Sequence, residues 1–235
     1  MQYCLRRGCA LLAIAVAAGC GSNNSSSSDA TQDAVQPDAL PATDGCSDAA
    51  KLIYLFSTRS GGNAPRLYSL APLTKELKLI GTIGTNISAQ GVSPVAITIL
   101  RDGVHGYVSD SGHRLWQVNL ADASVDPQPL MDFVAAGGKP SDNYTVALVG
   151  DGQGQDTLYA EGYSKTFYRV DPTARTMTSL GLFPNLCDLT GTNSNKLIAF
   201  CDNTTIQEIN PQTLMSVSSD PAPGWKSTWA IAFWG

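Results

Sequence analysis

Histidine is scarce in this sequence, which has only His105 and His113 among 235 residues. Both fall in or beside predicted turns, and a histidine-based metal site needs more ligands than these two. The sequence also contains neither a Gly-x-Ser-x-Gly nucleophile elbow nor a phosphate-binding P-loop motif. We therefore predict no catalytic residue, no metal site and no cofactor.

Charge is also sparse, because only 15% of the residues are Asp, Glu, Lys or Arg and the formal net charge is −5. No stretch forms the basic stripe that a nucleic-acid partner would require. A long amphipathic helical pattern is missing too, since the best periodic segment outside the predicted strands, residues 130–136, is too short to be stable alone. The sequence thus favours an all-β protein that does not bind nucleic acid.

The N-terminal segment has the pattern of an export signal. Arg6 and Arg7 precede an apolar run over residues 9–18, which small residues follow. The run is shorter than the roughly 20 residues that a permanent membrane-spanning helix needs. Without residues 1–19, 13 basic and 20 acidic residues remain, so the exported chain has a formal charge of −7.

The segment Val16-Ala-Ala-Gly-Cys20 resembles the lipobox of bacterial lipoproteins, although Ala17 stands where leucine is usual. The resemblance implies cleavage after residue 19 and lipidation of Cys20. It also implies an exported protein that is anchored to a membrane, most simply the outer membrane, with its head facing the periplasm or the cell surface. The alternative is an ordinary signal peptide in which Cys20 is incidental.

Residues 20–49 lack the apolar side chains needed for a core and are rich in Ser, Asp and Pro, which predicts a disordered tether. The folded domain is then residues 50–235. At this length, one well-buried all-β domain is expected.

Within this domain one segment occurs in four copies, which start at Arg66 (RLYSLAP), Arg114 (RLWQVNL), Thr166 (TFYRVDP) and Thr205 (TIQEINP). Each copy is a short β-type run that ends in a turn signal. A repeat of about 40 to 50 residues with several strands in each copy is typical of a propeller or another β-array. The domain resembles bacterial β-propeller repeat proteins, and this resemblance implies a fold but no particular activity.

The units differ in their predicted strand number. The second, third and fourth have four strands each, and the outer strand of the second is expected at residues 126–130. The first has only three, at residues 51–57, 66–71 and 77–80. The run 228–233 resembles the first strand of the other units. We therefore predict a small propeller of four blades with four antiparallel strands each, closed by the C-terminal strand lying beside residues 52–56. An irregular β-sandwich and a partial ring that needs a partner are the alternatives.

The exported part retains three cysteines, Cys46, Cys187 and Cys201. Cys187 and Cys201 flank a predicted hairpin, and cross-strand pairing would bring their Cβ atoms close enough for a disulfide. Two buried free thiols are the alternative. Cys46 is the unpaired one, which is either free or competes for one of these partners.

Propellers usually bind ligands at one end of the axis, on the loops that enter the innermost strands. These loops contribute a mixed polar set with one aromatic residue, consistent with a sugar or a peptide ligand. The candidate ligand-binding residues are Ser93, Asp142, Asn143, Asn185, Asp188, Trp225 and Lys226. The alternative is that these loops are merely solvated.

The Gly-rich segment 150–156 contains Asp151 and Asp156. Its sequence is compatible either with a calcium site or with a plain hairpin turn.

Taken together, these patterns favour a lipid-anchored exported protein whose propeller head binds a carbohydrate or a protein and is not catalytic. A lyase or glycan hydrolase built on the same fold is the main alternative, and clustered carboxylates at the end of the axis would favour it. A third hypothesis is a secreted assembly or adhesion module.

Overall fold

The computed structural model describes residues 12–16, 52–57, 64–83, 87, 92–151, 153–192, 194–202 and 204–222; for residues 12–16 it describes the backbone alone. The strands form four sheets, each of four antiparallel strands. In chain order they are β1 (Leu12–Val16), β2 (Ile53–Ser57), β3 (Arg66–Ala71), β4 (Glu76–Thr82), β5 (Pro94–Ile99), β6 (His105–Asp110), β7 (Arg114–Asn119), β8 (Met131–Asp132), β9 (Tyr144–Gly150), β10 (Asp156–Gly162), β11 (Thr166–Asp171), β12 (Thr176–Leu182), β13 (Cys187–Gly191), β14 (Leu197–Cys201), β15 (Thr205–Asn210) and β16 (Met215–Pro221).

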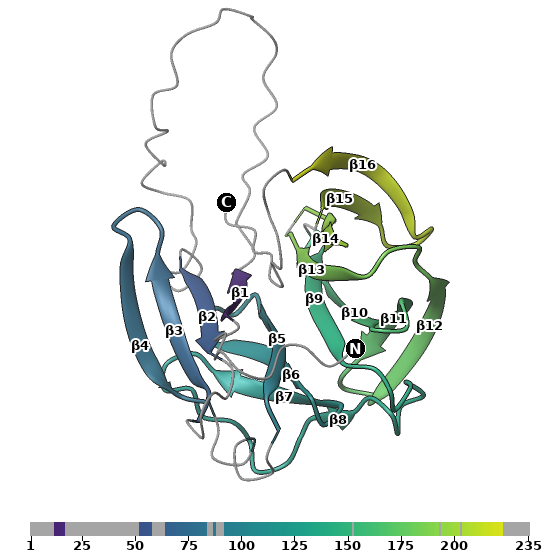
Figure 1. Cartoon of the computed structure of the whole chain (residues 1–235). Helices are drawn as coiled ribbons and strands as arrows, with labels where there is room; N and C mark the ends of the chain where they lie inside the picture. The colour runs from purple at the N-terminus through teal and green to yellow at the C-terminus, as the bar shows by residue number, and fades with distance from the viewer. Residues whose placement is uncertain are drawn as a thin grey trace, which may run out of the picture.

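The four sheets follow one another around a common centre as the blades of a propeller (Figure 1). Each blade uses four strands in chain order: blade 1 is β1–β4, blade 2 is β5–β8, blade 3 is β9–β12 and blade 4 is β13–β16. The first strand of each blade lies innermost, where β5 contacts both β1 and β9, and β9 also contacts β13. The predicted all-β propeller of four blades is thus confirmed.

The recurring sequence segment forms the third strand of every blade, β3, β7, β11 and β15. Its polar ending has a structural role, because the side chain caps the turn that follows. Asp171 Oδ1 accepts the backbone N–H groups of Thr173 and Ala174, at 3.0 and 2.8 Å. Asn210 Oδ1 makes the equivalent pair of bonds in blade 4, and Asn119 makes one in blade 2. The repeat therefore includes both the strand and its turn chemistry.

The same hairpins share a residue with left-handed backbone geometry. The positive φ angles are 57° at Lys75, 61° at Ala123, 56° at Arg175 and 55° at Leu214, one in each turn between the third and fourth strands. None of these residues is the glycine or asparagine that usually occupies such a position. The blades therefore repeat a backbone conformation that a search for glycines could not find.

The hydrophobic core lies between neighbouring blades. Blades 1 and 2 enclose Phe56, Leu67 and Trp116, all fully buried. Blades 2 and 3 enclose a second cluster around Tyr144, and blades 3 and 4 enclose a third around Phe167. Because both faces of an inner blade are covered, every residue of β9 is buried. This arrangement explains why the strands read as nearly continuous apolar runs.

Blade 1 differs from the prediction at its inner edge. Strand β1 occupies this edge and pairs with β2 in antiparallel register from Leu12 opposite Ser57 to Val16 opposite Ile53. The prediction assigned this place to residues 228–233, which lie outside the described residues. That prediction rests on the resemblance of residues 228–233 to the first strands of the other units, and it treats residues 9–18 as part of a leader.

The outer strand of blade 2 also differs from the prediction. Residues 126–130 were expected to form it, but β8 begins only at Met131 and covers two residues. Pro127 and Pro129 have no backbone N–H to donate to a neighbouring strand. The pairing therefore starts after them, apart from an isolated bridge between Val118 and Val125.

Candidate functional site: a polar mouth over blades 3 and 4

The loops that enter the inner strands gather at one end of the propeller, which we call the mouth. Ser93 directly precedes β5, Asn143 directly precedes β9, and Asn185 lies two residues before β13. Since β5, β9 and β13 lie side by side around the centre (Figure 1), their N-terminal ends meet there. Trp225 and Lys226, the other two predicted loop residues at this end, lie outside the described residues.

Ser93 serves the scaffold of blade 2. Its N–H donates to Ser111 Oγ at 3.0 Å, and its carbonyl accepts the N–H of Ser111 at 2.8 Å. The adjacent turn is held by Asp110, which is fully buried and accepts the indole N–H of Trp116 at 2.7 Å. Arg114 forms an ion pair with the same carboxylate at 3.1 Å. On this blade the polar groups are therefore used to fix the loops.

Asp142 also anchors a loop. It is 2% exposed, and its carboxylate accepts the backbone N–H of Ser164 at 2.9 Å and the Ser164 hydroxyl at 2.6 Å. Its backbone carbonyl lies 2.7 Å from His113 Nδ1. The next residue, Asn143, accepts the N–H of Tyr163 through its carbonyl at 3.2 Å. These bonds fix the turn between β10 and β11, and with it Tyr163, over the start of β9.

Two carboxyl groups lie near each other where blades 3 and 4 meet. Glu161 on β10 is 1% exposed, and neither of its carboxylate oxygens makes a hydrogen bond of ordinary geometry. Burial raises the pKa of Glu161 to about 9 against the opposing effect of the nearby Cys187 backbone N–H, and the charge of Asp188 on β13 adds a smaller contribution. Burial likewise raises the pKa of Asp188 to about 6. Glu161 is consequently neutral at physiological pH, whereas Asp188 titrates just below it.

Tyr163 completes this group. Its side chain is 49% exposed, and burial of the rest, together with the charge of Asp188, raises the pKa of its phenol. An exposed ring beside a carboxylate offers a stacking surface next to a hydrogen-bond acceptor. Of the predicted site residues that are described, Asp188 is the one that has this setting.

Glu161 was missed by the sequence analysis. It follows the apolar strand residues of β10 and is paired with Thr145 on β9. The signal that could have identified Glu161 is an acidic residue within the buried part of β10. Its neighbours across the blade interface could be identified only from the structure.

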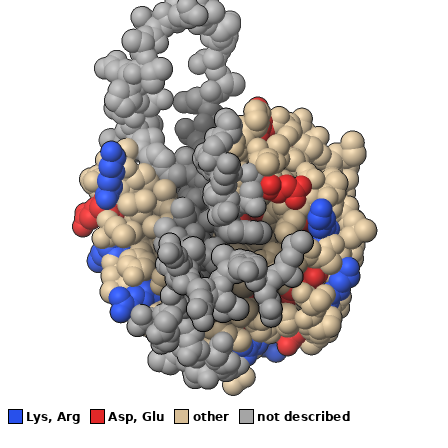
Figure 2. All heavy atoms as spheres, viewed as in Figure 1, with Lys and Arg blue, Asp and Glu red and all other residues tan. Residues whose placement is uncertain are grey.

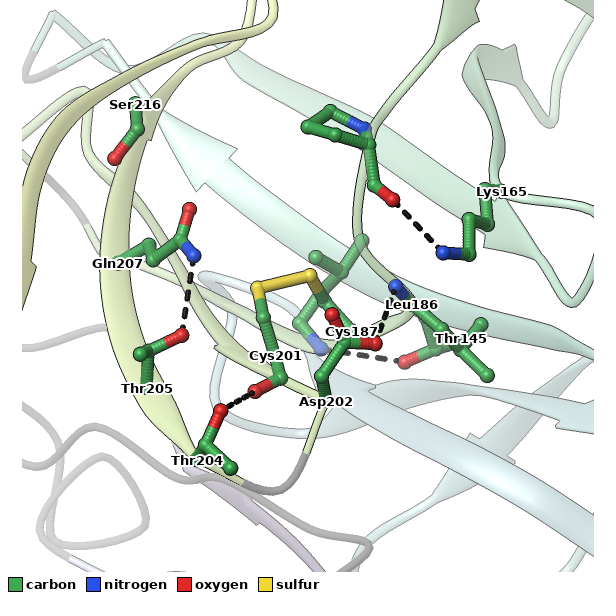
Figure 3. Close-up of a disulfide and its surroundings, with 12 residues drawn as sticks. Thr145, Lys165, Leu186, Cys187, Cys201, Asp202, Thr204, Thr205, Gln207 and Ser216 are labelled. Carbon is green, nitrogen blue, oxygen red and sulfur yellow. Dashed lines mark hydrogen bonds between the residues drawn. A yellow bond between two sulfur atoms is a disulfide. The ribbon is translucent and has the colours of Figure 1, made fainter. Parts of the chain in front are cut away.

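A disulfide fixes the position of Asp188. Cys187 and Cys201 are bonded, with an S–S distance of 2.09 Å, which confirms the predicted bridge. Figure 3 shows this bond between the start of β13 and the end of β14. Cys46 lies outside the described residues.

Two hydrogen bonds hold the loop that precedes Cys187. The N–H of Leu186 donates to Asp202 Oδ1 at 3.2 Å, and the Lys165 ammonium donates to the carbonyl of Pro184 at 2.8 Å (Figure 3). Asn185, between these two points, is partly exposed. The segment before Asp188 is therefore held on both of its sides.

The structure does not support a metal site in its described part. The described residues contain no group of three or more His, Cys, Asp or Glu side chains that could hold an ion. Asp156 forms an ion pair with Arg101 at 2.6 Å, and Asp151 accepts the N–H groups of Gln153 and Gln155 within its own turn. The segment 150–156 is thus a hairpin turn, and its acids are engaged.

Charged groups on the face shown in Figure 2 are scattered, with acidic and basic side chains interspersed. Among the described residues, no helix is both long and apolar enough to cross a membrane.

Comparison with known proteins gives information about the fold but not about the function. No protein-family model matches the sequence, and no curated protein is significantly similar to it. A structural genomics protein of unknown function from Bacteroides thetaiotaomicron has a similar structure, with a TM-score of 0.54 and 10% identity over 80% of this chain. The match covers 52% of that protein, so this chain spans about half of its length.

Two weaker similarities have TM-scores of 0.44 and 0.41. They are to a chain of the mitotic checkpoint complex, at 10% identity over 84% of this chain and 61% of that one, and to the computationally designed Ika8 protein, at 12% identity over 72% and 46%. At these identities the comparisons concern the fold alone. The chain is a four-bladed β-propeller that resembles a protein of unknown function.

Proposed function

We propose that the protein is an exported lipoprotein whose propeller head binds a carbohydrate or a peptide at the mouth, without catalysis. The observation that carries this proposal is the proximity of Tyr163 to Asp188, both of them on segments that hydrogen bonds and the disulfide hold in place. A rigid scaffold lowers the entropy that binding would otherwise cost. The exposed ring can stack on a sugar or a side chain, while the carboxylate accepts a hydroxyl or an ammonium donor.

The anchor part of the proposal is supported by sequence features alone. These are the basic start at Arg6 and Arg7, the apolar run, the lipobox-like ending at Cys20 and the polar tract that follows. A lipid on Cys20 would place the head at a membrane surface, at the end of a tether of about 30 residues. Such a tether has a typical reach of roughly 30 Å.

Binding at the mouth can be tested with Asp188→Asn. The purified full-length protein would be screened on an array of neutral oligosaccharides and short peptides, and the best ligand would be measured by calorimetry. Hydrogen bonds to a charged group contribute about 1.5–3 kcal/mol, so we expect the variant to bind roughly 10- to 150-fold more weakly. Asp220→Asn, on the exposed strand β16, is the matched control and should bind normally. Equal affinities for the two variants would contradict the proposal.

One observation favours a glycan hydrolase or lyase as a second candidate. Glu161 and Asp188 are two interacting carboxyl groups whose environments give them different pKa values, about 9 and about 6, as acid and base pairs require. Against it stands the position of Glu161, which at 1% exposure does not reach a bound substrate. Release of product from an oligosaccharide by the wild type, with loss of that activity in Asp188→Asn, would favour this candidate over simple binding.

A further inference from the structure

A second concave site lies at the end of the propeller opposite to the mouth. It is an open cleft of about 690 Å³ between blades 2 and 3. The turns from β5 to β6, from β9 to β10 and from β11 to β12 contribute to it. Because strand direction alternates within a blade, these turns lie at the far end from the loops that enter the inner strands. The volume is within the range of about 300–1,000 Å³ that is typical of small-molecule sites.

The cleft combines apolar and hydroxyl-bearing walls. Tyr107, Leu158 and Val170 supply the apolar part, and Thr173 and Thr178 are among the threonines that line it. An aromatic ring with several hydroxyl groups suits a ligand that has both a weakly polar face and many hydroxyls of its own. A saccharide has this character.

The acidic side chains of the cleft are already engaged. Asp156 receives two hydrogen bonds from the Arg101 guanidinium, at 2.6 and 3.1 Å. Asp171 caps the turn after β11. Asp102 accepts the N–H groups of Val104 and His105, at 2.8 and 2.9 Å, and lies 2.7 Å from the His105 ring. Asp156 is thus paired with Arg101, whereas Asp102 and Asp171 keep their negative charge while their oxygens accept hydrogen bonds from nearby backbone N–H groups.

Arg169 is different. It lies on β11 between Tyr159 of β10 and Thr178 of β12, and it is exposed. Its charge lowers the pKa of the Tyr159 phenol, against the larger effect of burial. Among the described residues we find neither an ion pair nor a side-chain hydrogen bond for its guanidinium. In the described part of the chain, Arg169 is thus an arginine of the cleft whose guanidinium is not bound by a carboxylate.

We propose that this cleft binds an acidic saccharide, with Arg169 pairing with the carboxylate of a uronic acid. Arginine presents planar, paired donors that match a carboxylate. The threonine hydroxyls exchange hydrogen bonds with the sugar hydroxyls, and Tyr107 packs against a ring face. This site is separate from the mouth, so the inference goes beyond the proposed function and does not depend on it.

The test is calorimetry on the purified full-length protein with a glucuronic acid-containing disaccharide. The neutral glucose disaccharide and free acetate serve as companion ligands, since they separate the sugar from the charge. We expect the acidic disaccharide to bind, and to bind less tightly as salt is raised. Arg169→Gln should weaken it roughly 10- to 150-fold, the loss expected for a charge-assisted bond.

Arg66→Gln is the matched control, because it removes the same charge from blade 1, away from the cleft. Arg66→Gln and Asp188→Asn should both retain wild-type affinity for the acidic disaccharide, and thermal melting would show that all variants are folded. Three results would overturn the inference: no binding to the wild type, equal binding of the neutral disaccharide, or an unchanged affinity in Arg169→Gln. None of these results would contradict the proposed binding at the mouth, which the Asp188→Asn experiment tests separately.

Discussion

The buried carboxyl of Glu161 should make the stability of the protein depend on pH in a way that a single substitution can isolate. The folded protein holds the proton of Glu161 up to a pKa of about 9, whereas the unfolded chain releases it above the ordinary value of 4.5. The proton therefore stabilises the fold at low pH. This stabilisation is lost progressively as the pH rises from 4.5 towards 9.

Each pH unit in this range costs the fold about 1.4 kcal/mol, so the loss between pH 5 and pH 8 is about 4 kcal/mol. Glu161→Gln does not titrate and avoids this loss. A constant cost of burying the amide changes the stability of the variant by the same amount at every pH, and it cancels when the two pH values are compared. We therefore expect the stability of Glu161→Gln relative to the wild type to rise by about 4 kcal/mol from pH 5 to pH 8.

Urea unfolding at several pH values measures this difference. Asp188, Lys165 and Asp202, the other charged groups that act on Glu161, are unchanged in the variant, so their own titration is largely common to both proteins. Glu76→Gln is the matched control, because Glu76 is exposed at the start of β4 and its substitution should show no such trend. A difference between Glu161→Gln and the wild type that stays within about 1 kcal/mol from pH 5 to pH 8 would refute the argument, since it would mean that the carboxylate is ionised and satisfied in the fold.

Two further predictions concern the cysteines. Replacing both Cys187 and Cys201 by alanine opens a loop with a sequence separation of 14, which should cost about 3 kcal/mol in urea unfolding; a variant as stable as the oxidised wild type would contradict the structural role of the bridge. If Cys20 is the lipidated N-terminus, intact mass spectrometry of protein extracted from membranes should find a chain that begins at this residue and carries diacylglycerol, and a chain cut elsewhere without lipid would refute the anchor.

The architecture could be predicted because each of the four blades imposes similar packing requirements on its residues, so that similar sequence segments recur. Each third strand needs apolar residues to pack against the neighbouring blades, and in blades 2, 3 and 4 a polar side chain also caps the following turn, so a related segment returns at every blade. The same reasoning identified the hairpin of Cys187 and Cys201. Local chemistry and repetition were sufficient for these features, since each depends on residues close in sequence.

Other features depend on contacts that the sequence pattern does not contain. The neutral state of Glu161 comes from burial between blades 3 and 4, and its neighbour Asp188 belongs to the next blade. The left-handed turn residues, such as Lys75 and Leu214, carry no glycine signal. The cleft beside Arg169 forms from turns of two different blades. For Glu161 and for the cleft, the position of one blade against another decides the outcome.

The inner edge of blade 1 shows why a leader and an inner strand can be confused. Both must be short, apolar and rich in small or β-branched residues, because a leader crosses an apolar medium and an inner strand is covered on both faces. Leu12–Val16 meets both requirements, and in the structure it pairs with β2. Cleavage before Cys20 would remove it and leave five residues of β2 without their partner strand. The run 228–233 (TWAIAF) is also short and largely apolar, and it lies outside the described residues. Lipidation of Cys20 and closure of blade 1 are therefore linked: if the lipid is present, the edge of β2 must be covered by a segment other than β1, and within this chain residues 228–233 are the strand that the repeat predicts.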